Sequence, residues 1–405
     1  MVHEPIVNHI GVAGNKGPGI RSDCWIAAEL TEGGGYDIQL NSKVSALFGD
    51  SIMALAEELL ASFGLVNIKL TIDDSGALPF VLAARIEAAL KQVIETDQEY
   101  WPDLIPENQY HTESDRSRRS RLYLPGNTPK LMLNAGIHKS DGIILDFEDS
   151  VAPAKKDEAR LLVRNALRQV DFYGAERMVR INQLPRGLDD LAFIVPHNVN
   201  LVLIPKVERA EQVEQVDARI QEIGGAQGID YPIWLMPIIE SALGVVNAFG
   251  IASASPNVVA LAIGLEDYTA DIGAARTAEG RESFFARSQL VNAARAAGIQ
   301  PIDSVFSDIS DMEALRMVAL ESKALGFDGM GCIHPRQIVV IHDAFAPSDQ
   351  EIDKAKRIVL AFDEATVKGL GVVSLGSKMI DPPVVKRAQH TIDLAVRQGS
   401  WTWDG

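Results

Sequence analysis

The feature that most constrains the fold is an alternation of short apolar stretches and helix-like stretches from residue 119 onward. Helical stretches include 155–169, 207–222, 282–297 and 312–325. The apolar stretches have the length of buried strands and number eight: 121–124, 143–145, 178–181, 201–204, 233–238, 258–263, one near Ile302 and one at 331–333. Eight strand–helix units in succession predict a parallel (β/α)8 barrel, an α/β fold.

Polar side chains follow nearly every predicted strand at its carboxyl end. In chain order they are Asp146 with Glu148, Asn182 after Arg180, Lys206, Glu240, Asp267, Asp303 and His334. Barrel enzymes assemble their active sites from side chains at these strand ends. The spacing therefore predicts a site at the carboxyl-terminal face of the barrel.

The segment GIILDFEDSV (142–151) places three carboxylates, Asp146, Glu148 and Asp149, directly after a buried strand. Buried carboxylates are costly unless a cation meets them. One interpretation is that these carboxylates belong to the active site. The other is that they cap the next helix and pair with the basic residues that follow. Across the whole chain they fit supporting positions best, with Asp146 and Glu148 orienting a substrate-binding arginine or a metal-bound water.

Glu240 and Asp267 are the predicted metal ligands, because they follow neighbouring strands of the barrel. Mg²⁺ prefers oxygen ligands and usually binds through one or two carboxylates, water and substrate. Glu266 competes with Asp267 for this role. The alternative for Glu240 is a charge at a helix N-terminus.

Arg180, in the motif VRIN, is the predicted clamp for a substrate carboxylate, because its planar guanidinium suits bidentate binding. The alternative is a structural pair with Asp146 or Glu148. Arg119 and Glu240 are also expected to contact substrate. His334 is expected to be structural.

The net charge of −17 argues against nucleic-acid binding. No run of about 18 apolar residues occurs, and no apolar signal core opens the chain, so neither a membrane span nor secretion is expected, and we expect a cytoplasmic protein. Cys24 and Cys332 are too few for a disulfide framework and are expected to be buried.

The first 95 residues predict a small α+β domain. Strands at 24–30 and 36–40 are expected to form a hairpin, followed by a helix at 42–63, a strand at 66–72 and a helix from Pro79 to about residue 94. The glycine-rich loop at 11–23 lacks the GK[ST] of a phosphate loop, and it is expected to present Ser22 beside Asp23.

The second region resembles the β subunit of citrate lyase, within the aldolase family that includes malyl- and citramalyl-CoA lyases. The motifs are RSRLYLPGN (119–127), LDFEDSV (145–151), VRIN (179–182), PKVE (205–208), ESALG (240–244), GLEDYTADIG (264–273), GFDGMGCIHPRQI (326–338) and GVVSLGSKMIDPPVV (371–385). The resemblance implies that Arg180 contacts substrate and that Glu240 and Asp267 bind Mg²⁺. It also implies a C-terminal lid whose Asp381 is the acid/base, often in a neighbouring subunit's site.

Residues 11–91 resemble the acyl carrier subunit of citrate lyase, through Ala13-Gly14, Ser22-Asp23 and DDSGALPFVLAARIEAAL (73–90). In that family a serine carries a phosphoribosyl-dephospho-coenzyme A group. The family's serine stands two residues before the aspartate, where this chain has Arg21. We therefore assign the attachment of this group to Ser22, whose side chain carries the nearby hydroxyl.

Together these features predict four segments: an acyl-carrier-like domain (1–95), a linker (96–118), a barrel (119–345) and a C-terminal helical lid (346–405). We expect a homo-oligomeric Mg²⁺-dependent lyase that cleaves a citryl thioester to an acetyl thioester and oxaloacetate, with a separate acyl transferase as partner. The alternative is a lyase for free malyl-CoA or citramalyl-CoA, whose first domain is degenerate and serves docking or oligomerisation.

Overall fold

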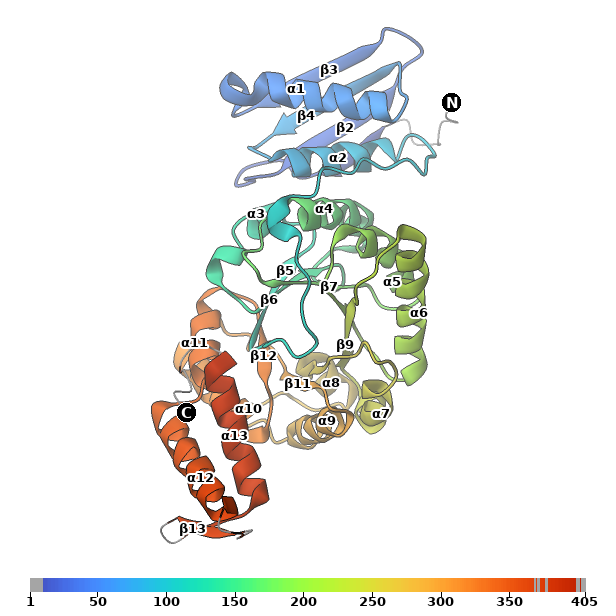
Figure 1. Ribbon diagram of the computed structural model, residues 1–405. Helices are drawn as coiled ribbons and strands as arrows, with labels where there is room; N and C mark the ends of the chain where they lie inside the picture. Colours follow the sequence, from blue (N-terminus) through green and yellow to red (C-terminus); the bar gives the residue numbers. More distant parts are fainter. Residues whose placement is uncertain (1–9, 368, 370–371, 376–377, 398–400, 402–405) are drawn as a thin grey trace.

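The computed structural model describes residues 10–367, 369, 372–375, 378–397 and 401, and its centre is a closed barrel of eight parallel strands (Figure 1). The last barrel strand pairs with the first, which closes the ring. This confirms the predicted (β/α)8 fold. The strands are β5 (Ser120–Pro125), β6 (Gly142–Asp146), β7 (Glu176–Arg180), β8 (Leu201–Ile204), β9 (Trp234–Ile239), β10 (Ala260–Ile263), β11 (Gln300–Asp303) and β12 (Gly329–Cys332).

Helices surround the barrel and cover the outer faces of its strands (Figure 1). The four helices expected from periodicity are present within a few residues of their predicted ends. The surrounding helices are α3 (Pro129–Met132), α4 (Lys156–Gln169), α5 (Arg186–Asp190), α6 (Ala210–Gln227), α7 (Ala242–Ala252), α8 (Leu265–Asp271), α9 (Phe284–Ala297), α10 (Met312–Leu325) and α11 (Arg336–Phe345).

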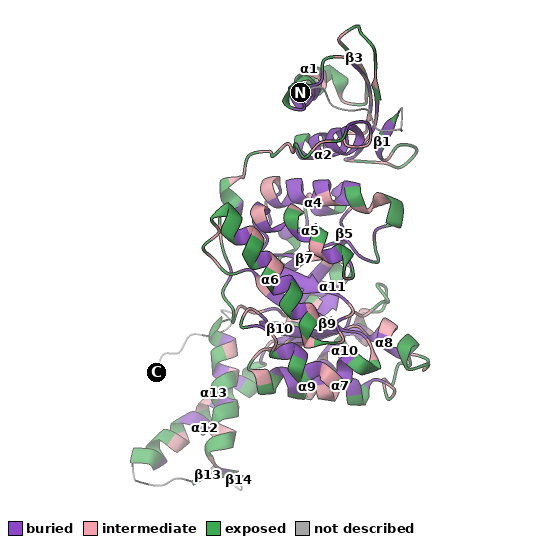
Figure 2. Cartoon of the chain, turned by 90° about the vertical axis from the view of Figure 1, so that its right-hand side faces the viewer, coloured by how far each residue is buried: buried purple, intermediate pink, exposed green. Residues whose placement is uncertain are grey.

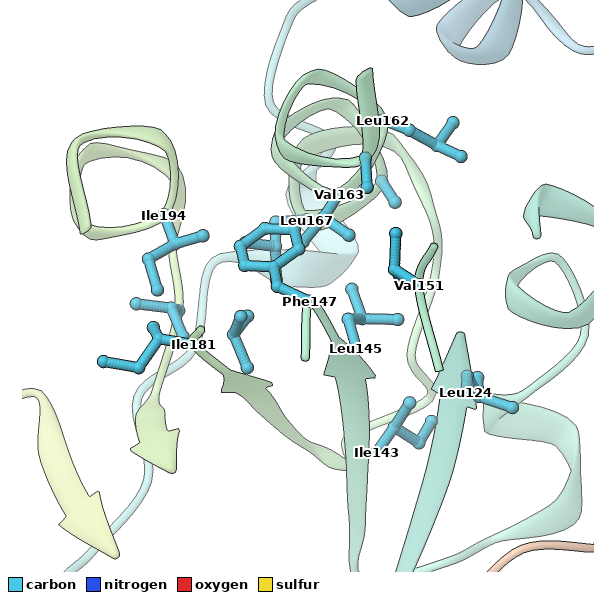
Figure 3. Close-up of a cluster of buried hydrophobic side chains, with 14 of the residues drawn as sticks. Leu124, Ile143, Leu145, Phe147, Val151, Leu162, Val163, Leu167, Ile181 and Ile194 are labelled. Carbon is cyan, nitrogen blue, oxygen red and sulfur yellow. The ribbon is translucent and has the colours of Figure 1, made fainter. Parts of the chain in front are cut away.

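Strand β6 shows how the apolar runs specify the core. Its side chains alternate between two faces, as in any strand. Ile144 joins the cluster that fills the barrel interior, with Met178 and Met236. Ile143 and Leu145 belong to the outer cluster between the strands and helix α4 (Figure 3). Because both faces of β6 are buried, its sequence is a continuous apolar run that ends at the first functional carboxylate.

The N-terminal region forms a separate four-stranded sheet with two helices, α1 (Ser45–Ser62) and α2 (Pro79–Leu90). The expected hairpin is wrong. Strand β4 (Ile68–Asp74) lies between β2 (Cys24–Leu30) and β3 (Tyr36–Ser42), antiparallel to the first and parallel to the second. A further strand, β1 (Gly11–Gly14), lies in the segment expected to be only loop. Cys24 and Cys332 are both buried, as expected.

Residues 96–118 lie along the barrel and are attached to it by buried side chains. Asn108 donates to the carbonyl oxygens of Leu167 and Val170, at 3.1 and 2.6 Å. The fully buried Arg118 pairs with Glu176 at 2.7 Å.

The C-terminal region is a pair of helices, α12 (Asp349–Val367) and α13 (Pro382–Arg397), joined through the two-stranded β13 (Val373–Leu375) and β14 (Lys378–Ile380). The pair extends away from the barrel, with β13 and β14 at its far tip (Figures 1 and 2). A groove of about 1470 Å³ lies between α13 and the amino-terminal end of the barrel, lined by Arg119 and Lys386 among others. In the described part of the chain, no helix is long and apolar enough to cross a membrane.

Candidate active site

A cluster of charged side chains occupies the carboxyl-terminal ends of strands β6 to β10. Asp146 is the last residue of β6 and Arg180 the last residue of β7, and the register of the two strands places them opposite each other. Glu240 follows β9 directly, and Asp267 lies in the first turn of α8, after β10. The barrel closure therefore brings together residues that are more than 100 positions apart in sequence.

Arg180 is held by carboxylates on two sides. Its Nε and Nη2 donate to the two oxygens of Asp146 at 2.6 and 2.8 Å. Its Nη1 lies 2.9 Å from Oε2 of Glu148. The guanidinium also lies 5.4 Å from the ring centre of Tyr123. These contacts fix the guanidinium, and the hydrogen bond from Arg180 helps to hold the pKa of Asp146 below its ordinary value despite burial.

Glu240 is a buried carboxylate, and no cationic side chain of the described residues lies in hydrogen-bond contact with it. Its Oε2 accepts from the backbone N–H of Lys206 at 2.8 Å. Burial raises the pKa of Glu240 to about 7, and the nearby Asp267 and Glu148 add to the rise. Gly264 makes room for it, because a Cβ at that position would lie 2.3 Å from Oε1 of Glu240.

Lys206 stands where several acids converge. Its Nζ lies 3.4 Å from Asp267, 3.5 Å from Glu148 and 3.9 Å from Asp149. Its backbone has the left-handed φ of +50°, which is strained for a residue with a side chain. This conformation aims the N–H at Glu240 while the ammonium group reaches the other carboxylates.

The cluster carries more negative than positive charge. Its five carboxylates face three cationic side chains: Arg180, Lys206 and Lys156, whose ammonium group donates to the carbonyl oxygens of Phe147 and Glu148. Burial and the neighbouring Glu148 raise the pKa of Asp149 to about 6, a second sign of excess negative charge. A divalent cation fits this excess. Mg²⁺ usually binds through one or two carboxylates and keeps several of its waters.

Comparisons with known proteins agree with this geometry. Residues 119–335 match the family model described as HpcH/HpaI aldolase/citrate lyase. The chain belongs to this family. The citrate lyase subunit beta of Leuconostoc mesenteroides is 40% identical over 70% of this chain and 94% of its own length, and the human mitochondrial citramalyl-CoA lyase is 33% identical over 72% and 90%. Relatives with these names are carbon–carbon lyases, so the chain is an enzyme of that class.

Solved structures of the family contain the expected ion. The CitE protein of Mycobacterium tuberculosis, in complex with magnesium, acetoacetate and coenzyme A, is 30% identical over 69% of this chain and 98% of its own, with a TM-score of 0.59. The citrate lyase beta subunit from the same organism, complexed with oxaloacetate and magnesium, is 32% identical. The match covers 58% of this chain and 100% of that one, with a TM-score of 0.50. Both of these structurally similar proteins were therefore solved with magnesium bound.

The small domain has a match of its own. Residues 15–93 match the family model described as malonate decarboxylase delta subunit, an acyl-carrier-type domain. This confirms the carrier resemblance of the N-terminal region. In the structure, Ser22 is half-buried, has a left-handed φ of +56°, and donates its backbone N–H to Ser75 at 3.0 Å.

Two predicted residues do not join the cluster of this aldolase-family barrel. Arg119 precedes β5 and pairs with Asp141 through two hydrogen bonds of 2.9 Å, at the amino-terminal end of the barrel. Asp381 lies between β14 and α13, where its Oδ1 accepts from the N–H of Val384 at 3.2 Å. Within one chain, Asp381 therefore caps a helix.

Four further residues near the strand ends show where sequence and structure agree or differ. Glu266, the competitor of Asp267, pairs with Arg276. His334 accepts from the backbone N–H of Arg336 at 3.1 Å. The bridging position of Lys206 was not foreseen, although its motif PKVE and its place after a strand were visible. Gln183, which donates to Glu148 at 3.0 Å, had no recognisable signal.

Proposed function

We propose that the protein cleaves a 3-hydroxy-3-carboxyacyl thioester, citryl thioester, to an acetyl thioester and oxaloacetate in a Mg²⁺-dependent reaction. The observation that carries this proposal is the fixed guanidinium of Arg180 beside the undercompensated carboxylates Glu240 and Asp267. This combination suits a substrate that presents a carboxylate and a hydroxyl to a metal and an arginine.

Each group has a role in that reaction. Arg180 binds a carboxylate of the substrate and stabilises the negative charge that develops when the hydroxyl loses its proton to solvent. The Cα–Cβ bond then breaks, the hydroxyl carbon becomes the ketone of oxaloacetate, and the bonding electrons leave with the acetyl thioester as its enolate. Asp146 and Glu148 hold Arg180 in place, as their hydrogen bonds of 2.6 to 2.9 Å indicate. Glu240 and Asp267 would hold Mg²⁺, which supplies Lewis-acid stabilisation of that charge. Lys206 stabilises the surplus of carboxylates around them.

Asp381 completes the reaction as the acid that protonates the carbon of the departing acetyl thioester enolate, or removes that proton in reverse. Because Asp381 lies between β14 and α13 in a projecting helix pair, we propose that it acts in the site of a second copy of the chain. The protein is then active as a homo-oligomer.

The carrier role belongs to Ser22. The surrounding loop fits a phosphodiester, because the neighbouring Arg21 is exposed and Gly17 and Gly19 leave space around the backbone. A phosphoribosyl-dephospho-coenzyme A group on Ser22 would supply the thiol that carries the acyl chain. Loading citrate onto that thiol requires a separate acyl transferase as partner.

A second function has its own support. Arg21 occupies the place of the usual carrier serine, and relatives named citramalyl-CoA lyase and L-malyl-CoA/beta-methylmalyl-CoA lyase match the barrel. In this alternative the protein cleaves a free CoA thioester, and the small domain serves docking or oligomerisation.

Two measurements separate the proposals. Intact-mass measurement of protein from its native host should show an adduct on Ser22, and an unmodified mass would refute the carrier role. Cleavage of citryl-, malyl- and citramalyl-CoA should favour citryl-CoA in kcat/KM. A preference for malyl- or citramalyl-CoA would establish the alternative.

A further inference from the structure

The small domain is joined to the barrel by a buried interface between two helices. Helix α2 lies alongside α4 in both views of the molecule (Figures 1 and 2). Arg164 of α4 pairs with Glu87 of α2 at 2.5 Å, and neither side chain is exposed to solvent. Asn165 donates to the carbonyl oxygen of Phe80 at 3.1 Å. The interface therefore contains satisfied buried charges as well as apolar contacts.

Arg85 is the centre of this interface, and it is fully buried. On the side of the small domain, its Nε donates to Asp23 at 3.0 Å. On the side of the barrel, its Nη1 donates to Glu158 at 3.0 Å and its Nη2 to the carbonyl oxygen of Asn127 at 3.1 Å. One guanidinium thus connects the aspartate beside Ser22 with the loop after β5 and with the first turn of α4.

A second set of contacts attaches the start of the serine loop. The N–H of Gly14 donates to Oε2 of Glu158 at 2.6 Å. Lys155 donates to the carbonyl oxygen of Gly14 at 3.1 Å and pairs with Glu158 at 2.6 Å. Both ends of the loop from Gly14 to Asp23 are therefore held by the same corner of the barrel.

That corner belongs to the carboxyl-terminal face. Asn127 follows β5, and Lys155 and Glu158 lie where the chain enters α4 after β6. The neighbouring Gly126 donates its N–H to the carbonyl oxygen of Asp146 at 2.8 Å. Asp146 in turn binds Arg180. A short series of contacts thus leads from the serine loop to the active-site cluster.

The interface should resist opening. Undocking the small domain would expose or separate the pairs of Arg85 with Glu158 and of Arg164 with Glu87 together. A domain on a mobile tether would show a polar and poorly packed contact instead.

From these contacts we propose that the small domain is fixed on the barrel of its own chain and presents Ser22 to that barrel's own carboxyl-terminal face. The inference rests on the proposed carrier function. The moving part is then the arm on Ser22 and not the domain. The tethered thioester meets the Arg180 cluster of the same chain at a raised effective concentration.

Cross-linking tests the placement without any need for enzyme activity. Cysteines replace the exposed Arg21 and the half-buried Thr128, which follows Asn127, and a bismaleimide joins them in the full-length protein. Cys24 and Cys332 are buried and should not react. The matched control pairs Arg21→Cys with Met317→Cys, an exposed position on α10.

We expect the first pair to form a link within one chain, seen as a monomer band on a denaturing gel and as a single linked peptide by mass spectrometry. The control pair should not link within the chain. Covalent dimers from the first pair, or no link at all, would overturn the fixed placement.

Mixed assemblies test the reaction itself. Ser22→Ala lacks the arm and Asp267→Ala lacks a metal ligand, so each parent should be inactive toward arm-bound substrate. If the arm serves its own barrel, co-assembled oligomers should show no activity above the parents, whereas recovered activity would show transfer to a neighbour. If wild-type protein carries no adduct on Ser22, the carrier function fails while the cross-linking result still decides the docking.

Discussion

Replacing Arg180 by Met should both destabilise the protein and lower its activity, because the guanidinium pairs with two buried carboxylates and, in the proposed reaction, binds the substrate. Arg180 donates to Asp146 at 2.6 and 2.8 Å and contacts Glu148 at 2.9 Å, and both acids are almost completely buried. Glu148 would keep Lys206 and Gln183, but Asp146 would lose its ion-pair partner, which should cost about 3–5 kcal/mol in the free energy of unfolding. Loss of the carboxylate clamp should lower kcat/KM by about 10²–10³-fold.

The pH dependence of this variant follows from the pKa of Asp146. The bond with Arg180 helps to lower that pKa, so the pair stabilises the wild type above the pKa of the unfolded carboxyl and less as pH falls through the folded pKa. Arg180→Met loses this contribution. The difference in stability between wild type and variant should therefore be largest near neutral pH and shrink in acid.

Arg119→Met is the matched control, because Arg119 also makes two hydrogen bonds to one carboxylate, that of Asp141, but at the opposite end of the barrel. Urea unfolding and steady-state kinetics would be measured on both variants. We expect Arg119→Met to lose some stability and keep its kcat/KM. A wild-type kcat/KM in Arg180→Met would refute the reasoning. A loss of kcat/KM in Arg119→Met alone would instead support the predicted contact of Arg119 with substrate.

Three further predictions concern the metal, the space beside it and a buried histidine. Glu240→Ala and Asp267→Ala should each abolish Mg²⁺-dependent cleavage, and full activity in either would refute the ligand assignment. Gly264→Ala should weaken Mg²⁺ binding about 10-fold or more in calorimetry, since its Cβ would meet Oε1 of Glu240 at 2.3 Å, whereas Gly250→Ala, whose Cβ meets no atom within 4 Å, should bind normally. Burial lowers the pKa of His197 to about 3. Below about pH 6.5 the unfolded chain therefore takes up a proton at this histidine that the folded chain does not. The free energy of unfolding should fall on acidification by roughly 1.4 kcal/mol per pH unit from this group. His197→Gln should lack this part of the slope in urea unfolding between pH 6 and 4.5, and an unchanged slope would contradict the assignment.

The barrel could be predicted from sequence because its signals are local. Strands buried on both faces appear as short apolar runs, and each helix carries its own periodicity. The pairing of strands in the small domain is not local. Strand β4 pairs on both sides, with β2 and β3, and an alternating pattern does not state which strand is its partner.

The site was only partly predictable for the same reason. A residue that ends a strand is visible in sequence, so Arg180, Glu240 and Asp267 could be chosen in advance. The position of Lys206 depends on its left-handed backbone and on three acids from other parts of the chain, two after β6 and one in α8. The placement of Asp381 depends on how a helix pair projects, and no spacing in the chain encodes that.

The most direct test of the central proposal is product analysis after incubation of citryl-CoA with the purified protein and Mg²⁺. ¹³C NMR of labelled substrate should show acetyl-CoA and oxaloacetate in equal amounts, with no cleavage after Mg²⁺ is chelated or in Asp267→Ala. Intact citryl-CoA under conditions in which malyl- or citramalyl-CoA is cleaved would contradict the account.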